Sequence, residues 1–246
     1  MFDNIDWLNS VAFVWFLCGW VGYSRLAKRR AKQVDCLASV MHRHRIDWMR
    51  SVFFREIRVS DAAIIANLER NVSFMASTSI LILAGVITVL ANSDQVSLLV
   101  SNLPFVLPAS IQYLQLKLLI LACIFIYAFF TFTWSLRQFG FCSVLIGASP
   151  VMREGELSEE ECESFARHSG KVLDQASHSY NFGLRSYYFS MAMLAWFIHP
   201  LLFIAAVGLV VSILYHREFH SNSLKALLQV NKDWHPNDKA IHHQTD

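Results

Sequence analysis

Four long apolar stretches divide this chain, and they constrain its fold more than any other feature of the sequence. They cover Ile5–Tyr23, Ser73–Ala91, Tyr113–Leu136 and Ser186–Tyr215. Each reaches or approaches the roughly 20 residues that a helix needs to cross about 30 Å of hydrocarbon. Charged residues make up only 16% of the chain, against about 25% in soluble domains. No stretch alternates with the period of a membrane strand. We therefore predict an all-α membrane protein with four transmembrane helices.

The basic residues gather between the first two apolar stretches and predict the orientation of the chain. Eleven of the 21 Lys and Arg residues lie in 25–70 and five lie in 137–185, whereas 92–116 has none. Cytoplasmic segments are enriched in Lys and Arg, so both basic segments are expected in the cytoplasm. The N-terminus then lies outside, and four crossings place the C-terminus outside as well. Basic residues beside a membrane span meet lipid headgroups more readily than nucleic acid. We therefore expect the lipid bilayer, and no nucleic acid, as a partner.

We expect the chain to divide into six segments. Acidic residues precede the first apolar stretch and no small-residue cleavage site is evident, so the first span is expected to be retained. The segments are an N-terminal transmembrane anchor (1–24), basic cytoplasmic helices (25–72), transmembrane helices 2 and 3 with an extracytoplasmic apolar loop (73–136), a cytoplasmic amphipathic helix region (137–185), transmembrane helix 4 with a proline kink (186–220) and a polar C-terminal tail (221–246).

Long amphipathic helices are predicted over 33–72 and 153–180, because apolar residues recur there with the 3.6-residue period of a helix. Ser158, followed three residues later by Glu161, has the pattern of a capping box that starts a helix. At Ser60, either a new helix begins or one helix continues into the second span. The acidic helix after Ser158 is a suitable partner for the basic helices of 33–58. Both regions are expected to project from the bilayer into the cytoplasm.

His199 is the sharpest single candidate for a functional residue. It lies near the middle of the fourth apolar stretch, beside Pro200, which removes a backbone donor and kinks a helix. An ionisable group at that depth is costly and often marks a functional site. One interpretation is a gate or a proton-linked group. The other is a neutral imidazole that bonds to a carbonyl freed by Pro200.

Two spans carry polar or small faces that could line a pathway. Offsets near whole helical turns place such residues on one side of a helix. Small residues also let helices approach closely in lipid, so packing is the alternative interpretation. The candidates are Ser77 and Thr88 in the second span and Thr131, Ser135 and Gln138 at the end of the third.

A cluster of charged residues is predicted at the cytoplasmic boundary. Its members flank the ends of spans at roughly one height, and rings of charge of this kind give channels their selectivity. The alternative is anchoring at the interface with ordinary ion pairs, such as Arg58 with Asp61 at an i,i+3 spacing. The cluster comprises Glu69, Arg70, Arg137 and Arg185, with Glu56, Arg58 and Asp61 deeper in the cytoplasm.

The sequence carries no recognisable catalytic motif. It lacks a glycine-rich phosphate loop, GxSxG, HExxH and a carboxylate pair, and its five cysteines form no CxxC. His216 and His220 have the i,i+4 spacing that can bind a metal on a helix, but no carboxylate stands at a fixed third position. We therefore expect no enzymatic activity, no catalytic residues, no cofactor and no metal site.

Short motifs spread over residues 50–220 form a recognisable set. They are Arg55–Asp61, Phe74–Ser79, Phe132–Gln138, Leu145–Pro150, Gly183–Phe189, Trp196–Pro200 and Arg217–Phe219. With these motifs the chain resembles a bacterial family known as domain-of-unknown-function family 599. The resemblance implies a multi-pass protein of the bacterial inner membrane. The family has no assigned activity, so it implies nothing about a substrate.

Three functions remain open from the sequence. The leading hypothesis is a homo-oligomeric channel- or transporter-like assembly for a small solute, with Arg137 and Arg185 at its cytoplasmic mouth, which favours an anionic one. The alternative is a membrane scaffold that recruits a cytoplasmic protein partner through the two amphipathic regions. The third is an intramembrane enzyme centred on His199 and Tyr188. Self-association is expected, because four spans with small-residue faces form a thin bundle that further copies can complete.

Overall fold

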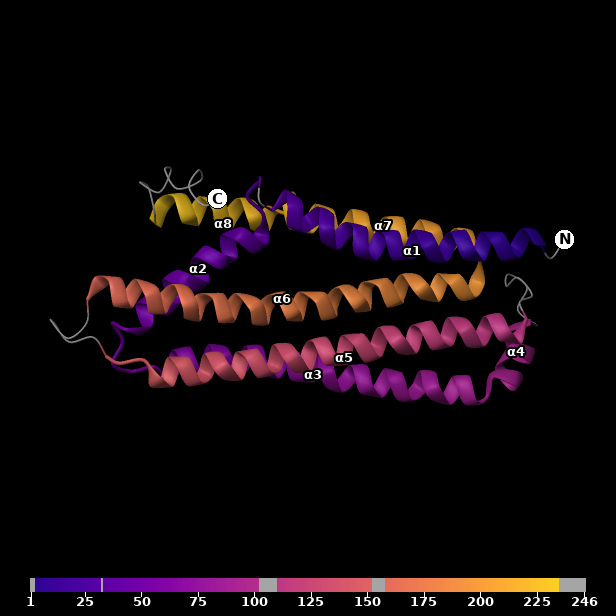
Figure 1. The fold of residues 1–246 in the computed structure, drawn as a ribbon, viewed down its shortest axis with the longest axis horizontal. Coiled ribbons are helices and arrows are strands. Elements are labelled where there is room, and N and C mark those ends of the chain that lie inside the picture. The colour runs from indigo at the N-terminus through magenta and orange to yellow at the C-terminus, as the bar shows by residue number, and fades with distance from the viewer. Residues whose placement is uncertain (1–2, 32, 102–109, 152–157, 235–246) are drawn as a thin grey trace.

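The computed structural model describes residues 3–31, 33–101, 110–151 and 158–234, and this part of the chain is helical apart from short connections. No strand occurs in it. The helices run mostly side by side as long rods, with the shorter α2 crossing between them and α8 extending α7 (Figure 1). Their bounds are α1 Asp3–Arg30, α2 Leu37–Val52, α3 Val59–Ala91, α4 Ser93–Ser101, α5 Ile111–Ala148, α6 Glu159–Ile198, α7 Pro200–Phe219 and α8 Asn222–Trp234.

Four stretches of helix are long and apolar enough to cross a membrane, namely Trp7–Ala27, Val59–Ala91, Ile111–Ala148 and Pro200–Val230. This confirms the predicted all-helical fold with four apolar helices. Only 17% of the apolar window of α3 is buried inside the chain, compared with 44% for α5. α5 is therefore the most enclosed of the four, and it packs between α3 and α6.

The fourth apolar stretch is a helical hairpin, so the expected single kinked helix over 186–220 is wrong. α6 ends at Ile198, and His199 adopts an extended backbone with φ −156° and ψ 135°. Pro200 then occupies the first turn of α7, where its missing N–H costs nothing because that position has no helical acceptor. The two helices run back along each other, with the rings of Trp196 and Phe203 stacked 4.8 Å apart.

The hairpin changes where the chain ends. α1 begins at one end of the bundle and α8 lies at the other (Figure 1). The expectation that both ends of the chain share one side of a membrane rested on a single fourth crossing, and the side on which each end lies stays a prediction. Within the expected apolar loop, Ser93–Ser101 forms α4, and 102–109 lie outside the described residues. Of the expected tail, Asn222–Trp234 forms α8, and 235–246 lie outside the described residues.

The amphipathic regions form α2, the start of α3 and the first half of α6. α3 begins at Val59 and runs to Ala91 without a break, so one helix joins the end of the basic region to the second apolar stretch. The predicted capping box is confirmed, since the Ser158 side chain accepts from the Glu161 N–H and Glu161 accepts from the Ser158 N–H. Ion pairs between Arg50 and Glu163 and between Arg45 and Asp174 hold α2 against α6, so the predicted pairing of these two helices is also confirmed.

Close packing between α5 and α6 depends on a glycine. A Cβ added at Gly183 would overlap the ring of Phe132, whose side chain is fully buried. Nearby, the hydroxyl of buried Ser135 donates to the Ala176 carbonyl at 2.7 Å. Small residues at a helix contact let two backbones come near enough for such bonds. This contact fixes α6 along the bundle and thereby places the residues described next.

Candidate functional site

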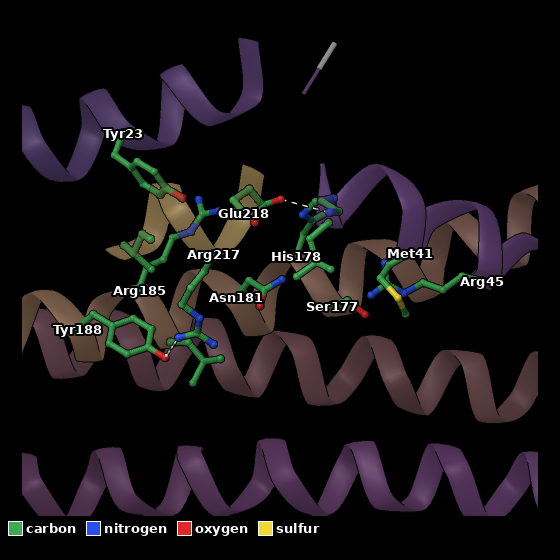
Figure 2. A pocket seen from close by; sticks show the side chains of 14 residues that line it. Tyr23, Met41, Arg45, Ser177, His178, Asn181, Arg185, Tyr188, Arg217 and Glu218 are labelled. Atoms are coloured by element: carbon green, nitrogen blue, oxygen red, sulfur yellow. Dashed lines mark hydrogen bonds between the residues drawn. The ribbon is translucent and has the colours of Figure 1, made fainter. Parts of the chain in front are cut away.

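A cavity with a largely polar lining lies where α1, α2, α6 and α7 meet (Figure 2). Its volume is about 280 Å³. Charged or hydrogen-bonding side chains from all four helices reach it, and leucines, an alanine and a methionine close its apolar parts. The polar lining consists of Tyr23, Arg45, Ser177, His178, Asn181, Arg185, Tyr188, Arg217 and Glu218.

Arg185 extends from α6 toward the C-terminal half of α1. Its guanidinium carbon lies 5.1 Å from the centre of the Tyr23 ring and 5.4 Å from that of Phe182. A cation against an aromatic face is attracted by the ring quadrupole, so the two rings hold the guanidinium in place. Within the described residues Arg185 forms no ion pair with a carboxylate.

Arg217 comes from the last turn of α7, where a cation also interacts favourably with the helix dipole. Its Nη1 donates to the Tyr188 hydroxyl at 2.7 Å, and its guanidinium carbon lies 5.7 Å from the centre of the same ring. The side chain is exposed. Like Arg185, it has no carboxylate partner among the described residues. Both guanidiniums are thus positioned by aromatic groups.

Glu218 is the acidic residue of the cavity, and its carboxylate has a structural task. Oε1 accepts from the backbone N–H of Ala38 at 3.2 Å (Figure 2). Ala38 lies in the first turn of α2, whose N–H groups lack helical acceptors. Glu218 therefore satisfies a donor at the start of α2 and also joins α2 to the end of α7.

Asp174 organises the charges on the α2 side of the cavity. Its carboxylate lies 2.6 Å from Arg45, 3.2 Å from His178 and 3.5 Å from His42. Burial alone would raise the pKa of Asp174, but the hydrogen bonds from His178 and His42 and the charge of Arg45 hold it well below its ordinary range. Asp174 thus remains a carboxylate, and Arg45 is already neutralised by it.

A second cavity of about 560 Å³ adjoins the first. The two share Ala38, His178, Arg185 and Glu218. The second is lined in part by small or apolar side chains: Ala27 and Ala31 of α1 and Phe182 of α6. Both volumes are within or close to the roughly 300 to 1,000 Å³ typical of ligand pockets.

Several predicted pathway residues have other roles. Ser135 bonds to the Ala176 carbonyl, and Gln138 accepts from the Ser179 hydroxyl at 2.9 Å, so both are occupied at the contact of α5 with α6. The Thr131 hydroxyl donates to the Tyr127 carbonyl of its own helix. Ser77 and Thr88 are exposed on the outside of α3. Within a single described chain these five residues do not line one pathway.

His199 lies at the turn between α6 and α7, at the end of the bundle where α1 begins (Figure 1). Its Nδ1 accepts from the Leu201 N–H at 3.1 Å and so caps α7. The expected position inside a kinked helix is wrong, because α6 ends where the kink was expected. Tyr188 stands 11 positions earlier, about 16 Å away along α6 at 1.5 Å per residue. His199 and Tyr188 therefore do not form one catalytic centre.

The predicted charged cluster is dispersed over the molecule. Arg185 is its member in the cavity. Arg58 donates to the carbonyls of Ile146, Ser149 and Pro150 at the end of α5.

The expected pair of Arg58 with Asp61 is wrong, since Asp61 instead binds Arg55 and the Trp48 indole. The other members lie apart, with Glu56 and Arg70 exposed, Glu69 half-buried and Arg137 exposed over the Phe141 ring.

Sequence reasoning missed most residues of the cavity as members of one site. Tyr23, Arg45, His178 and Arg217 come from four different helices, and no spacing in the sequence links these helices. The available signal was the family motifs, since Gly183–Phe189 supplies Arg185 and Tyr188, and Arg217–Phe219 supplies the pair from α7.

No group of three or more His, Cys, Asp or Glu side chains in the described part of the chain is arranged to hold a metal ion. A search of curated proteins and a search of solved structures find no match to the chain. The family described as "Protein of unknown function, DUF599" matches residues 11–223, which is most of the chain. The protein therefore belongs to the DUF599 family.

Proposed function

We propose that this is a multi-pass membrane protein that binds an anionic ligand in the cavity lined by Arg185 and Arg217, which we call the arginine cavity. As a transporter- or channel-like homo-oligomer, it assists the passage of this ligand. One observation carries the proposal. Arg185 and Arg217 line one cavity, and aromatic groups rather than carboxylates position them. Arginine is well suited to recognise carboxylate or phosphate, because its planar guanidinium presents paired donors.

The charges of the cavity favour an anion over a cation. Arg45 is paired with Asp174, which leaves Arg185 and Arg217 against the single carboxylate of Glu218. A ligand with negative charge balances the excess positive charge of the cavity and gains charge-assisted hydrogen bonds.

The position of the cavity supports a location at the cytoplasmic surface of the inner membrane. Residues of α2 line it. α2 lies toward the end of the bundle opposite to the start of α1 (Figure 1), and basic residues are concentrated around that helix. By the positive-inside rule this end faces the cytoplasm. With the hairpin, the chain crosses five times, so its N-terminus lies outside and α8 lies in the cytoplasm.

Self-association remains part of the proposal. Only 17% of the apolar window is buried inside the chain in α1 and in α3, so each has a broad face for lipid or for another copy. Ser77 and Thr88 stand on the exposed side of α3. Small polar side chains on such a face let a second copy pack closely in lipid. In an oligomer these residues would border the space between protomers.

Binding and release assays on purified protein test the proposal. The probes are inorganic phosphate and glycerol 3-phosphate, measured by calorimetry in detergent and by release from proteoliposomes. We expect Arg185→Gln and Arg217→Gln to weaken binding and slow release, whereas Arg70→Gln should leave both unchanged, because Arg70 does not line the cavity and its side chain donates to Asn67. Folded protein that neither binds nor releases any anionic probe, lipid phosphate included, would refute the proposal.

A scaffold remains the second candidate because of a specific exposed patch. Phe54, Ile57 and Val59 around the connection from α2 to α3 are 68%, 77% and 73% exposed. Clustered apolar side chains outside a bilayer often mark a protein contact. Cross-linking in cells from a photoreactive residue at position 57 would support this function if it captured one cytoplasmic protein reproducibly and Phe54→Ser abolished the product. Binding and release of anions by the purified Phe54→Ser protein should be unchanged.

A further inference from the structure

We infer that the ligand of the arginine cavity is a small acidic amino acid, whose two carboxylates bind Arg185 and Arg217 and whose ammonium binds Glu218. The inference rests on the proposed anion site and names the chemical class of its ligand. Three charged side chains that the fold leaves without a charged partner in the described residues lead to it.

The carboxylate of Asp174 lines the adjoining cavity but is already engaged within the protein. It lies 2.6 Å from Arg45, and His178 and His42 approach it at 3.2 Å and 3.5 Å. Three side chains thus share one carboxylate, which leaves it little capacity to bind a cation from a ligand. Arg45 is neutralised by the same contact and offers no free charge to the arginine cavity.

The charges that remain belong to three side chains. Arg43 lines the adjoining cavity but pairs with Asp35 at 2.8 Å. By contrast, Arg185, Arg217 and Glu218 form no ion pair within the part of the chain that the structure describes. All three line the arginine cavity, and Arg185 and Glu218 also line the adjoining one. A ligand therefore meets two positive charges and one negative charge.

The two guanidiniums are held at different places. Arg185 points toward Tyr23 and Arg217 toward Tyr188, at 5.1 Å and 5.7 Å from the respective ring centres (Figure 2). Each guanidinium presents its own paired donors, so each is suited to a carboxylate of its own. A ligand with two carboxylates gains charge-assisted hydrogen bonds from both arginines at once.

Glu218 provides the position for an ammonium. Its Oε1 accepts from the Ala38 N–H at 3.2 Å, and the side chain is only half-buried. A carboxylate has about four lone-pair positions, so this bond leaves capacity for a further donor. In an α-amino acid the ammonium and one carboxylate stand on the same carbon. This pair suits Glu218 and Arg185, which line both cavities, and the side-chain carboxylate is left for Arg217.

The charge and size of an acidic amino acid also suit the cavity. The ligand carries two negative charges and one positive charge, which is the reverse of the three side chains, so the occupied site is neutral. The cavity volume of about 280 Å³ lies near the lower limit of roughly 300 Å³ for ligand pockets. A small molecule is therefore favoured over a larger anion.

Calorimetry on the full-length protein in detergent tests this inference with matched probes. L-aspartate is compared with succinate, which lacks only the ammonium, and with L-alanine, which lacks only the side-chain carboxylate. Inorganic phosphate serves as the simple anion. We expect wild-type protein to bind L-aspartate about tenfold or more tightly than either analogue, because each analogue leaves one charged side chain without its partner.

Replacing Glu218 should change the two dicarboxylates in opposite directions. Glu218→Gln should weaken L-aspartate binding about tenfold and strengthen succinate and phosphate binding, because the charge that attracts an ammonium repels these anions. A general structural defect would weaken all of them. Glu56→Gln is the matched control, since Glu56 is exposed and lies outside both cavities.

The arginine variants assign the two carboxylates. Arg217→Gln should abolish the preference for L-aspartate over L-alanine, whereas Arg185→Gln should weaken the binding of both amino acids. Arg137→Gln is the control arginine, because Arg137 packs on Phe141 outside both cavities. Circular dichroism and size-exclusion chromatography verify that each variant folds.

Each outcome decides the question. Opposite effects of Glu218→Gln on L-aspartate and succinate, together with the loss of selectivity in Arg217→Gln, support the inference. Wild-type protein that binds succinate or phosphate as tightly as L-aspartate, or a Glu218→Gln change that moves both dicarboxylates in the same direction, overturns it and leaves the proposed function standing. L-alanine binding as tight as L-aspartate binding also overturns it. Folded protein that binds none of the four probes overturns the inference and the anion site on which it rests.

Discussion

The carboxylate of Glu218 accepts a hydrogen bond from the backbone N–H of Ala38 across 180 positions of the chain, at 3.2 Å. This bond links the last turn of α7 to the first turn of α2. The same carboxylate lines both cavities beside Arg185. One side chain therefore combines a structural role at a helix start with control of the charge around the arginines.

Replacing Glu218 separates these two roles. Glu218→Gln keeps an oxygen that can accept from Ala38 but removes a negative charge from the cavity, so it should leave stability nearly unchanged and strengthen anion binding. Glu218→Ala removes the acceptor too and should cost about 1 kcal/mol, as loss of a helix cap does. Thermal unfolding in detergent and phosphate calorimetry measure the two effects. Weaker phosphate binding by a folded Glu218→Gln protein would contradict the assignment.

Asp174 should make the stability of the protein depend on pH in the acidic range. Its pKa in the folded protein lies below the ordinary value of 3.8. Its contribution to stability is therefore fully present above that pH and is lost as the pH falls further, toward the folded-state pKa. Asp174→Asn should lower stability by about 2 to 3 kcal/mol at pH 7, less than the roughly 3 to 5 of a fully buried pair, because 15% of the Asp174 side chain is exposed.

Thermal unfolding of both proteins between pH 7 and pH 3 measures this difference. The gap between wild type and Asp174→Asn should narrow as the pH is lowered. His42→Gln and His178→Gln test the two histidine contacts separately. A gap that stays constant down to pH 3 would show that the carboxylate charge does not contribute.

Gly183 should tolerate no side chain. Gly183→Ala places a Cβ against the ring of Phe132 and should cost about 1 to 3 kcal/mol, the usual range for overpacking. Phe132→Leu in the same chain should restore part of the loss by making room. Gly208→Ala is the matched control, because nothing lies within 4 Å of a Cβ there. It should be neutral or slightly stabilising, and equal losses at 183 and 208 would be inconsistent with this packing.

His199 should matter for stability and not for ligand passage. His199→Ala removes the acceptor for the Leu201 N–H and should cost about 0.5 to 2 kcal/mol, whereas His199→Asn keeps a capping group. Release of anions from proteoliposomes, corrected for folded protein, should be the same in both variants. A release rate that fell in His199→Asn as well would restore the gate that the sequence suggested.

The orientation of the chain can be measured with reporters. Green fluorescent protein fused after residue 246 should be fluorescent, because α8 is expected in the cytoplasm. Alkaline phosphatase fused within 102–109 should be active, because the connection between α4 and α5 is expected outside. A dark fluorescent fusion together with active phosphatase at the C-terminus would contradict five crossings.

The apolar helices were predictable because length and hydrophobicity identify a span without knowledge of its neighbours. The capping box at Ser158 was predictable for a similar reason, since it depends on four consecutive residues. The sequence predicts a kink at Pro200 where the structure has a hairpin, although a residue before proline tends to avoid helical geometry. His199 followed by Pro200 is compatible with either outcome, and only the packing of α7 against α1 and α6 selects the reversal.

The cavity could not be predicted from spacing. Tyr23 and Arg217 are 194 positions apart, and their proximity depends on how α1, α6 and α7 pack. The prediction that polar helical faces line a pathway could not be made reliable for a related reason. Ser135 and Gln138 share a helical side as expected, but the tertiary fold places α6 over it. A helical face predicts which residues lie together and does not predict what covers them.

The single residue that joins α6 to α7 has a consequence for biosynthesis. The second half of α6 does not meet the length and hydropathy expected of an independent span, whereas α7 does. Only His199 separates the two helices. The less hydrophobic second half of α6 must therefore enter the lipid beside α7. We expect the translocon to release the second half of α6 and α7 into the lipid together. If a ribosome stalls before α7 emerges, the second half of α6 should remain outside the lipid, and carbonate should extract the nascent chain.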